Sequence, residues 1–285
     1  MTADDIIRAV RDLPSLPAVV IELLDSMDQE DIDTHALAAK ITLDQALTAK
    51  TLRLANSSFY GMPSKVTTIA QAISVLGFHS IRTLVTACSI TGSFAAGAGP
   101  RSDFDFPAFW RHAVASAVCA RLLAPYCRVN PDAAFTAGLL HDLGTLVLVT
   151  GFPEQYRSAS AYQREHDCLT AEAQRAVFGI DHAAVGSALA AHWNFPAAIQ
   201  AAVAAHHQPD VAAEAERGSP LNLSTVIYVA NILAHALDLS CQQDDQAPPL
   251  SLPVWQALAL SDSACDSLFS NSQKMFNEMC QMLTP

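Results

Sequence analysis

The sequence contains little glycine and little charge for its length. Its 285 residues include 11 glycines, and only 15% of them are charged, whereas 51% are hydrophobic. So few glycines argue against an all-β fold with many tight turns. The hydrophobic residues are mainly Ala and Leu, with few β-branched runs, and this composition favours packed helices over sheets. We therefore expect an all-α protein that buries a substantial core.

Signals of export and of membrane insertion are missing as well. The 7 cysteines are scattered and form no C-x-x-C pair, so neither a zinc ribbon nor a disulfide framework is indicated. The first residues, Met1–Asp5, are acidic and do not resemble a signal peptide. No stretch offers the ~18 uninterrupted apolar residues of a membrane span. We expect a cytoplasmic protein that does not act at a membrane.

Clusters of Lys and Arg are also absent. The chain has 16 basic and 28 acidic residues, which gives a formal net charge of −12. A surface of this sign repels phosphate backbones, so we expect no nucleic-acid partner.

Cap and stop residues divide the chain into many short helices. Thr34 is expected to cap the helix that follows it. Asn130–Pro131 is typical of a helix start, and one continuous helix is expected over Ala133–Val149. Asp181 can cap the helix predicted over His182–Trp193.

Composition also suggests a division into lobes. A segment rich in Gly, Pro, Ser and Asp over residues 96–106 reads as a linker. It would separate an N-terminal helical lobe, residues 1–95, from a second helical lobe, residues 107–240. Residues 241–285 would form a C-terminal helical extension, whose Met-rich last helix is more typical of packing than of docking.

Among the ten histidines, a few stand out because of their neighbours. They are His112, His141 next to Asp142, His182, and the pair His206–His207. On a helix, His141 and Asp142 would point about 100° apart, so both can face one cavity between helices. Imidazole nitrogens together with carboxylate oxygens suit a divalent ion such as Fe, Mn, Zn or Ni.

The alternative is that these groups are core or capping residues that satisfy one another. For His141–Asp142 taken together with His206–His207, the chemistry alone leaves the two interpretations evenly balanced. The remaining histidines, His235 among them, are expected to have surface or packing roles.

Several longer motifs resemble those of HDOD domains, and they occur in the same order. The N-terminal motifs are Leu13–Pro17, Ile41–Thr48, Leu52–Ser57 and Ala72–Gly77. The later motifs are Phe109–His112, Gly138–Gly144, Phe178–His182 and Trp193–Pro196. The resemblance implies a multi-helix architecture in two packed lobes, related in fold to the HD and HD-GYP phosphohydrolases. It also implies a regulatory role in bacterial signalling.

A set of metal ligands follows from the same resemblance. In the related enzymes, histidines and aspartates at these motifs hold one or two metal ions. The matching positions here are His112, His141, Asp142, His182, His206 and His207, and Asn231 stands where the enzymes have a final aspartate.

Other positions depart from the enzymes. Thr145 replaces the lysine that follows the His-Asp motif, so a cation for phosphate contact is missing. Ala108 replaces an acidic residue one turn before His112. The Gly-Tyr-Pro loop expected after His206–His207 is absent, and Gln208–Asp210 stands in its place. Hydrolysis of cyclic dinucleotides by the HD-GYP mechanism is therefore not expected.

We accordingly expect a bacterial HDOD signalling module that acts mainly by contact with a protein partner, without catalysis. It would retain a site for one or two divalent metal ions. One alternative is a metal-dependent phosphohydrolase acting on nucleotides or cyclic dinucleotides. Another is a protein that senses a ligand in the vestigial pocket. The sequence specifies no oligomeric state.

Overall fold

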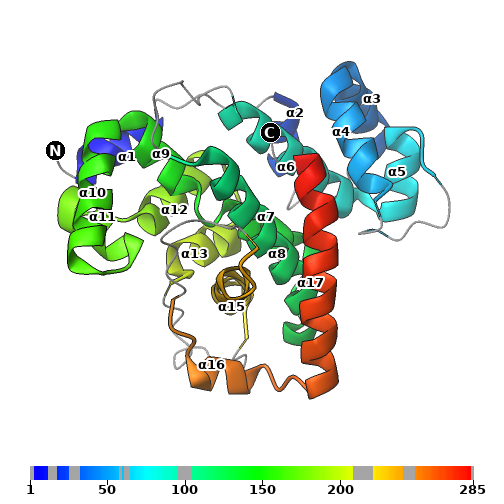
Figure 1. The fold of residues 1–285 in the computed structure, drawn as a ribbon. Helices are drawn as coiled ribbons and strands as arrows, with labels where there is room; N and C mark the ends of the chain where they lie inside the picture. Colours follow the sequence, from blue (N-terminus) through cyan, green and yellow to red (C-terminus); the bar gives the residue numbers. More distant parts are fainter. Residues whose placement is uncertain are drawn as a thin grey trace.

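The computed structural model describes residues 3–11, 18–25, 33–57, 60, 65–95, 104–207, 221–239 and 248–283. Among these residues every regular element is a helix and none is a strand (Figure 1). The expected all-α fold is confirmed. Some segments discussed from the sequence lie outside the described residues, namely the Leu13–Pro17 motif, most of the 96–106 linker and Gln208–Asp210.

The helices of the first part of the chain are α1 (Ala3–Arg11), α2 (Ala18–Asp25), α3 (Thr34–Leu43), α4 (Gln45–Ala55), α5 (Ile69–Leu76) and α6 (Phe78–Ala95). The second part contains α7 (Phe106–Leu123), the 3-10 turn η2 (Ala124–Cys127), α8 (Pro131–Leu140), α9 (Leu143–Gly151), α10 (Pro153–His166), α11 (Thr170–Phe178), α12 (His182–His192), α13 (Ala197–Ala205) and α15 (Leu223–Ala236). The last helices are α16 (Leu252–Ala257) and α17 (Asp262–Leu283).

Helices α2 to α6 pack on one another, and α7 to α15 form a second packed group (Figure 1). The two groups meet where α6 lies against α8. At this junction Asp132 of α8 accepts a hydrogen bond of 3.0 Å from Ser80 of α6 and pairs with Arg121 of α7. One carboxylate thus connects α6 of the first group to α7 and α8 of the second.

Helices α1 and α17 pack on helices that are far from them in the sequence. Helix α1 packs on α12 and α9 of the second group, with Ile6 and Val10 buried. Helix α17 lies along α7 and also contacts α4 and α6. Its buried residues include Phe276 and Met279, so the last helix has the packing role expected from its composition.

Two of the three predicted helix caps, those of α8 and α12, are confirmed. Asn130 caps α8 and Asp181 caps α12, as predicted. Helix α3 is capped by Asp33, whose carboxylate accepts from the N–H groups of His35 and Ala36. The prediction of Thr34 as the cap was wrong by one residue, because Asp and Thr are both common cap residues and the pattern does not choose between neighbours.

One stretch among the described residues, Pro131–Gly151, is long and apolar enough to cross a membrane by length and composition. Within this fold 83% of its most apolar window is buried, so it is a core segment here.

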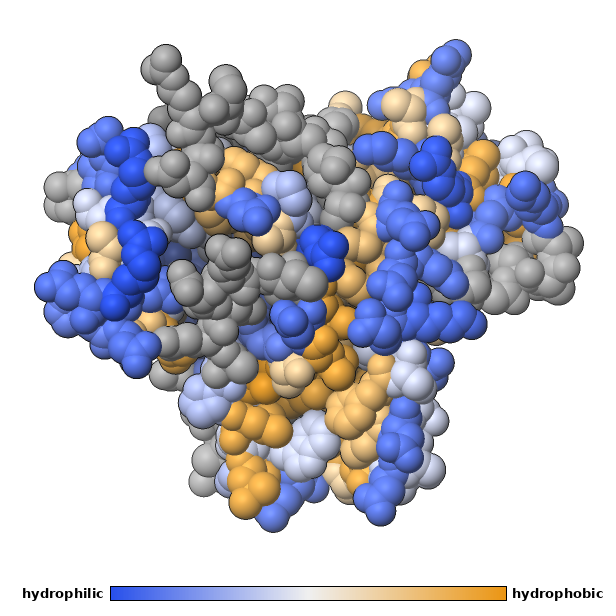
Figure 2. Space-filling model, in the orientation of Figure 1, coloured by the Kyte–Doolittle hydropathy of each residue, from blue (hydrophilic) through white to orange (hydrophobic). Residues whose placement is uncertain are grey.

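Hydrophilic residues cover much of the visible surface, while apolar residues gather near α16, where Leu252 is exposed (Figure 2).

The backbones of α9 and α12 approach each other closely at Gly144, in the middle of the second group of helices. At Gly144, the first turn of α9 meets α12 so closely that a Cβ would lie 2.0 Å from the carbonyl oxygen of His182. The same Cβ would lie 2.6 Å from the backbone nitrogen of Gly186. Only glycine fits at position 144, and this contact sets the distance between Asp142 and His182.

We predict that Gly144→Ala lowers the free energy of unfolding by about 3 kcal/mol or more, because the clash is with backbone and cannot be relieved by a side-chain rotation. Gly151→Ala is the matched control, since a Cβ at the other end of α9 meets nothing within 4 Å. That control should change stability by less than about 1 kcal/mol. Urea denaturation of both variants is the measurement, and equal stability of the two would contradict the close approach.

Candidate metal centre

His141 and Asp142 lie at a turn between α8 and α9. The prediction of one continuous helix over Ala133–Val149 was wrong. The backbone leaves the helical region at Asp142, with φ −101° and ψ 4°. Both halves are uniformly apolar, and α8 packs on α7 while α9 packs on α12. Periodicity cannot distinguish one long buried helix from two short ones.

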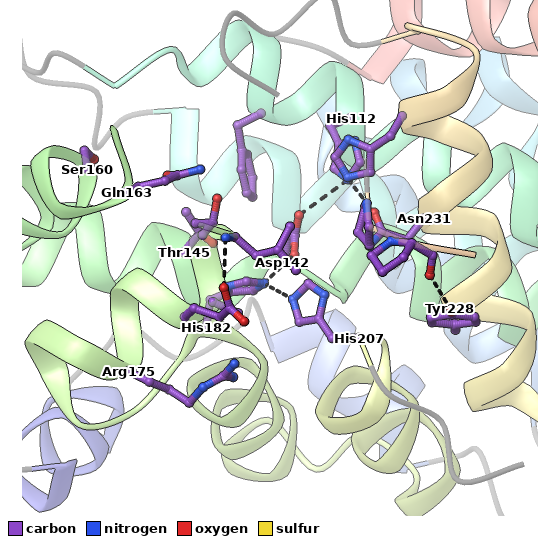
Figure 3. Close-up of a pocket in the computed structure, with 18 of the residues that line it drawn as sticks. His112, Asp142, Thr145, Ser160, Gln163, Arg175, His182, His207, Tyr228 and Asn231 are labelled. Atoms are coloured by element: carbon purple, nitrogen blue, oxygen red, sulfur yellow. Dashed lines mark hydrogen bonds and ion pairs between the residues drawn. The ribbon is translucent and has the colours of Figure 1, made fainter. Parts of the chain in front are cut away.

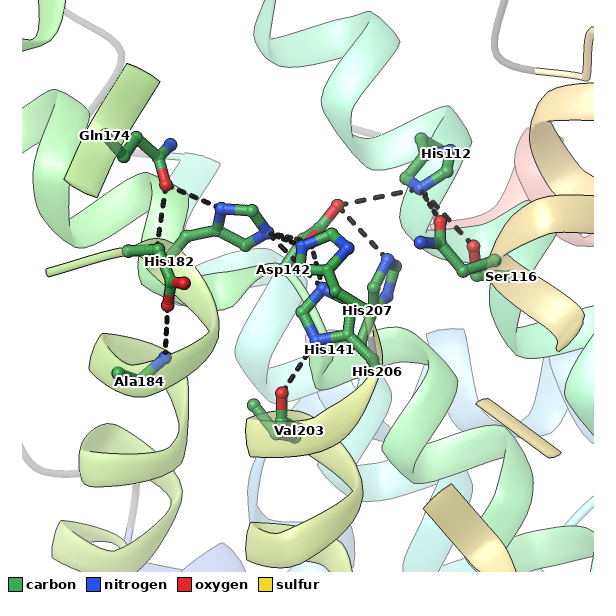
Figure 4. A network of polar contacts seen from close by, with 12 residues as sticks. His112, Ser116, His141, Asp142, Gln174, His182, Ala184, Val203, His206 and His207 are labelled. Carbon is green, nitrogen blue, oxygen red and sulfur yellow. Dashed lines mark hydrogen bonds and ion pairs between the residues drawn. The ribbon is translucent and has the colours of Figure 1, made fainter. Parts of the chain in front are cut away.

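The Asp142 carboxylate lies at the centre of a ring of imidazoles (Figure 4). Its Oδ2 is 3.5 Å from Nε2 of His112 and 3.1 Å from Nε2 of His141. Its Oδ1 is 3.1 Å from Nε2 of His182 and 3.3 Å from Nε2 of His206. Each carboxylate oxygen therefore faces two histidines from different parts of the chain.

A second group of histidines adjoins Oδ1. Nε2 of His182 is 3.3 Å from Nε2 of His206 and 2.8 Å from Nε2 of His207. His206 and His207 directly follow α13, and His182 is the first residue of α12. The turn after one helix and the start of another thus bring three imidazoles to one point.

Hydrogen bonds on the far side of the rings decide which nitrogen faces the centre. Nδ1 of His141 donates to the carbonyl of Gly138 at 2.7 Å, and Nδ1 of His206 donates to the carbonyl of Val203 at 2.7 Å. A carbonyl can only accept, so each Nδ1 carries a proton, and Nε2 is the nitrogen that faces the centre.

Gln174 of α11 accepts the corresponding hydrogen bond from His182. Its side-chain oxygen accepts from Nδ1 of His182 at 2.6 Å and from the backbone N–H of His182 at 2.8 Å. Two donors at one oxygen fix the orientation of the amide. Such outer contacts orient metal-bound histidines in proteins generally.

Burial and charge set the protonation of these groups. Burial alone would raise the pKa of Asp142, but the surrounding imidazoles, His141 first among them, hold it well below its usual range. Burial lowers the pKa of His206 to about 4 and lowers that of His112 well below its usual value. For His141, burial acts to lower the pKa, and the Asp142 carboxylate outweighs it and raises the pKa.

The centre therefore brings imidazole nitrogens close to carboxylate oxygens and to one another, and each such contact needs a proton or a metal ion between its two atoms. Three buried atoms here have no hydrogen-bond partner, namely Nδ1 of His112, Nε2 of His141 and Oδ1 of Asp142. Two groups, His112–His141–Asp142 and His182–His206–His207, each place their ligand atoms within 4.8 Å of one another. Nitrogen donors with one carboxylate suit a divalent transition ion, so the residues fit a metal.

Asn231 joins the centre from α15. Its Oδ1 lies 2.9 Å from Nε2 of His112. All seven residues named as candidate ligands from the sequence thus come together, five histidines around Asp142 with Asn231 beside His112. Metal binding by them remains a prediction.

A cavity of about 1060 Å³ opens over this centre. Figure 3 shows Asp142, His112 and His207 on one part of its wall and Ser160 and Gln163 of α10 on another. Pro248, Pro249 and Ser251 line a further part of the cavity. They are held by Tyr228 of α15, whose hydroxyl donates to the carbonyl of Pro249 at 2.8 Å and accepts from the N–H of Ser251 at 2.9 Å.

Sequence reasoning missed three of these contributors. Gln174 and Tyr228 carry no local signal, since a single Gln or Tyr on a helix is common. His235, expected to have a surface or packing role, lines the cavity and lies against the His112 ring. Its place one turn after Asn231 on the same helix was the available signal.

In the described part of the chain, a fold made only of helices places a histidine- and aspartate-lined centre beside a cavity. Residues 13–209, more than half of the chain, match the HDOD domain family, and the chain belongs to that family. The resemblance noted in the sequence is confirmed.

Solved structures of similar proteins support this fold. A Shewanella amazonensis protein provisionally named a phosphohydrolase is 28% identical, with 98% of both chains covered and a TM-score of 0.72. An HDOD domain protein from Geobacter sulfurreducens is 21% identical over 98% of this chain and 94% of its own, with a TM-score of 0.68. At that identity the second match shows the fold alone.

A protein from Treponema pallidum is 28% identical over 244 residues, or 83% of this chain. The chain spans only 45% of the length of that relative.

We predict that Gln174→Met weakens zinc binding about 10- to 100-fold, because His182 loses the acceptor that fixes its ring. Gln163→Met is the matched control, because Gln163 lines the cavity away from the histidines (Figure 3). Competition with a chromogenic chelator measures both affinities. Equal affinities would show that Gln174 does not orient His182 for metal.

Proposed function

We propose that this chain is an HDOD signalling module that holds divalent metal at Asp142 and acts through a protein partner, without turnover. The observation that carries the proposal is the composition of the site. The histidine ligands are together and oriented, but Thr145 stands in the first turn of α9 where the related enzymes have a lysine. The site therefore keeps the candidate metal ligands and lacks the lysine of the related enzymes.

The ligands divide between the two oxygens of Asp142. His112 and His141, with Asn231 beside them, would hold an ion at Oδ2. His182, His206 and His207 would hold an ion at Oδ1. A bound divalent ion would supply Lewis acidity and a water of lowered pKa.

The surrounding charges support a non-catalytic role. Asn231 offers a neutral amide where the enzymes have a carboxylate, so one negative charge is lost beside His112. Arg175 lines the cavity but pairs with Asp181 at the start of α12. Its charge is therefore partly neutralised before a phosphate could reach it.

A second candidate is a metal-dependent phosphohydrolase. The cavity of about 1060 Å³ favours it, because a purely structural metal site needs no such space. The Shewanella amazonensis relative, provisionally named a phosphohydrolase, supports the same candidate. Arg164 and Arg175 on the cavity wall would be the cations available to a phosphate.

The test is metal analysis together with a turnover screen on protein purified anaerobically without chelators or a His-tag. We predict near-stoichiometric iron, manganese, zinc or nickel in the wild type and its loss in His141→Ala/Asp142→Ala. His192→Ala is the control, because this histidine is exposed on α12. It should keep the metal.

The screen uses phosphomonoesters, nucleotides and cyclic dinucleotides, and we predict no turnover of any of them. Metal-dependent hydrolysis that the double variant loses would refute the non-catalytic role and establish the second candidate. Absence of metal from the wild type would refute the metal-holding role.

A further inference from the structure

His235 lies beside the metal centre on the helix that carries Asn231. The two residues are four apart on α15, so their side chains leave the same face of the helix. The His235 ring is half-buried, and its centroid is 4.3 Å from that of His112 with 36° between the planes. His235, His112, Asn231 and Asp142 all line the same cavity.

The two carboxylate oxygens of Asp142 have different numbers of imidazoles beside them. At Oδ1, His182, His206 and His207 offer three imidazoles. At Oδ2 there are two, His112 and His141, and the next group is the neutral Asn231 amide. The Oδ2 side therefore lacks one strong donor.

His112 also lacks a hydrogen bond that several of the other histidines make. His141, His182 and His206 each have Nδ1 held by an oxygen. Nδ1 of His112 is buried and has no hydrogen-bond partner. The face of its ring instead lies against His235, which places a second imidazole next to the side that lacks a donor.

We propose that His235 is a ligand of the metal ion on the Oδ2 side and replaces the carboxylate that Asn231 lacks. This inference rests on the proposed metal site. An imidazole in place of a carboxylate adds no negative charge and shifts the preference of the site from Mn²⁺ toward Zn²⁺ or Ni²⁺. In this proposal, the histidine at position 235 supplies the metal ligand that was lost when asparagine took the place of the carboxylate at position 231.

The variant His235→Phe distinguishes between two roles for His235, that of a metal ligand and that of a packing residue. Phenylalanine keeps a flat ring against His112 and removes the nitrogen donors. If His235 only packs, His235→Phe binds metal like the wild type. If it is a ligand, His235→Phe loses affinity as His235→Ala does.

Titration with Co²⁺ measures metal binding through the visible ligand-field absorption of the bound ion, and it does not depend on any catalytic activity. We predict two Co²⁺ equivalents in the wild type. In His235→Phe one equivalent should weaken about tenfold or more with a changed spectrum, while the other is unchanged. Asn231→Asp/His235→Phe should recover the lost affinity, because it restores a carboxylate on the same face of α15. The unchanged second equivalent shows that His235→Phe folds.

Wild-type binding in His235→Phe, or equal weakening of both equivalents, would overturn the role of His235 and leave the metal site standing. Failure of Asn231→Asp to rescue would overturn the compensation. A wild type that binds no Co²⁺ would overturn both this inference and the metal-holding role. His192→Phe, an exposed ring on α12, is the control and should bind both equivalents.

Discussion

The rest of the second lobe is arranged around the buried carboxylate of Asp142. An ionised carboxylate in an apolar core is costly unless opposite charge or hydrogen-bond donors surround it. Here the neighbours are imidazoles, and at His141 and His206 the far nitrogen already donates its proton to a carbonyl. Their Nε2 atoms face the carboxylate oxygens. Only a cation between them, a metal ion or an added proton, makes this arrangement favourable.

The backbone geometry follows from the same requirement. Asp142 leaves the helical conformation so that its side chain enters the centre, and Gly144 lets α9 approach the backbone at His182. Helices α7, α12 and α15 each add a residue from a different part of the sequence. The fold is therefore built to bring distant residues to one point, and the apolar packing of α8 and α9 provides the rigidity that a ligand set needs.

The fold class and the candidate ligands could be predicted from the sequence, because helix caps and the His-Asp motif are local signals. The break at Asp142 could not, because a run of buried apolar residues has the same pattern in one helix or in two. Gln174 could not be recognised as part of the site, since its importance comes from a contact made across the fold. His235 could have been noticed from its place one turn after Asn231 on α15. Asn231 was found only through the motif order, and its contact with His112 required the structure.

The most direct test of this account is anomalous X-ray diffraction from crystals of protein purified without chelators, with data collected on both sides of the absorption edge of the metal found. The account predicts anomalous peaks on the two sides of the Asp142 carboxylate, one facing His141 and one facing His182. An ordered histidine cluster with no anomalous peak would contradict it, and would mean that protons alone hold these side chains together.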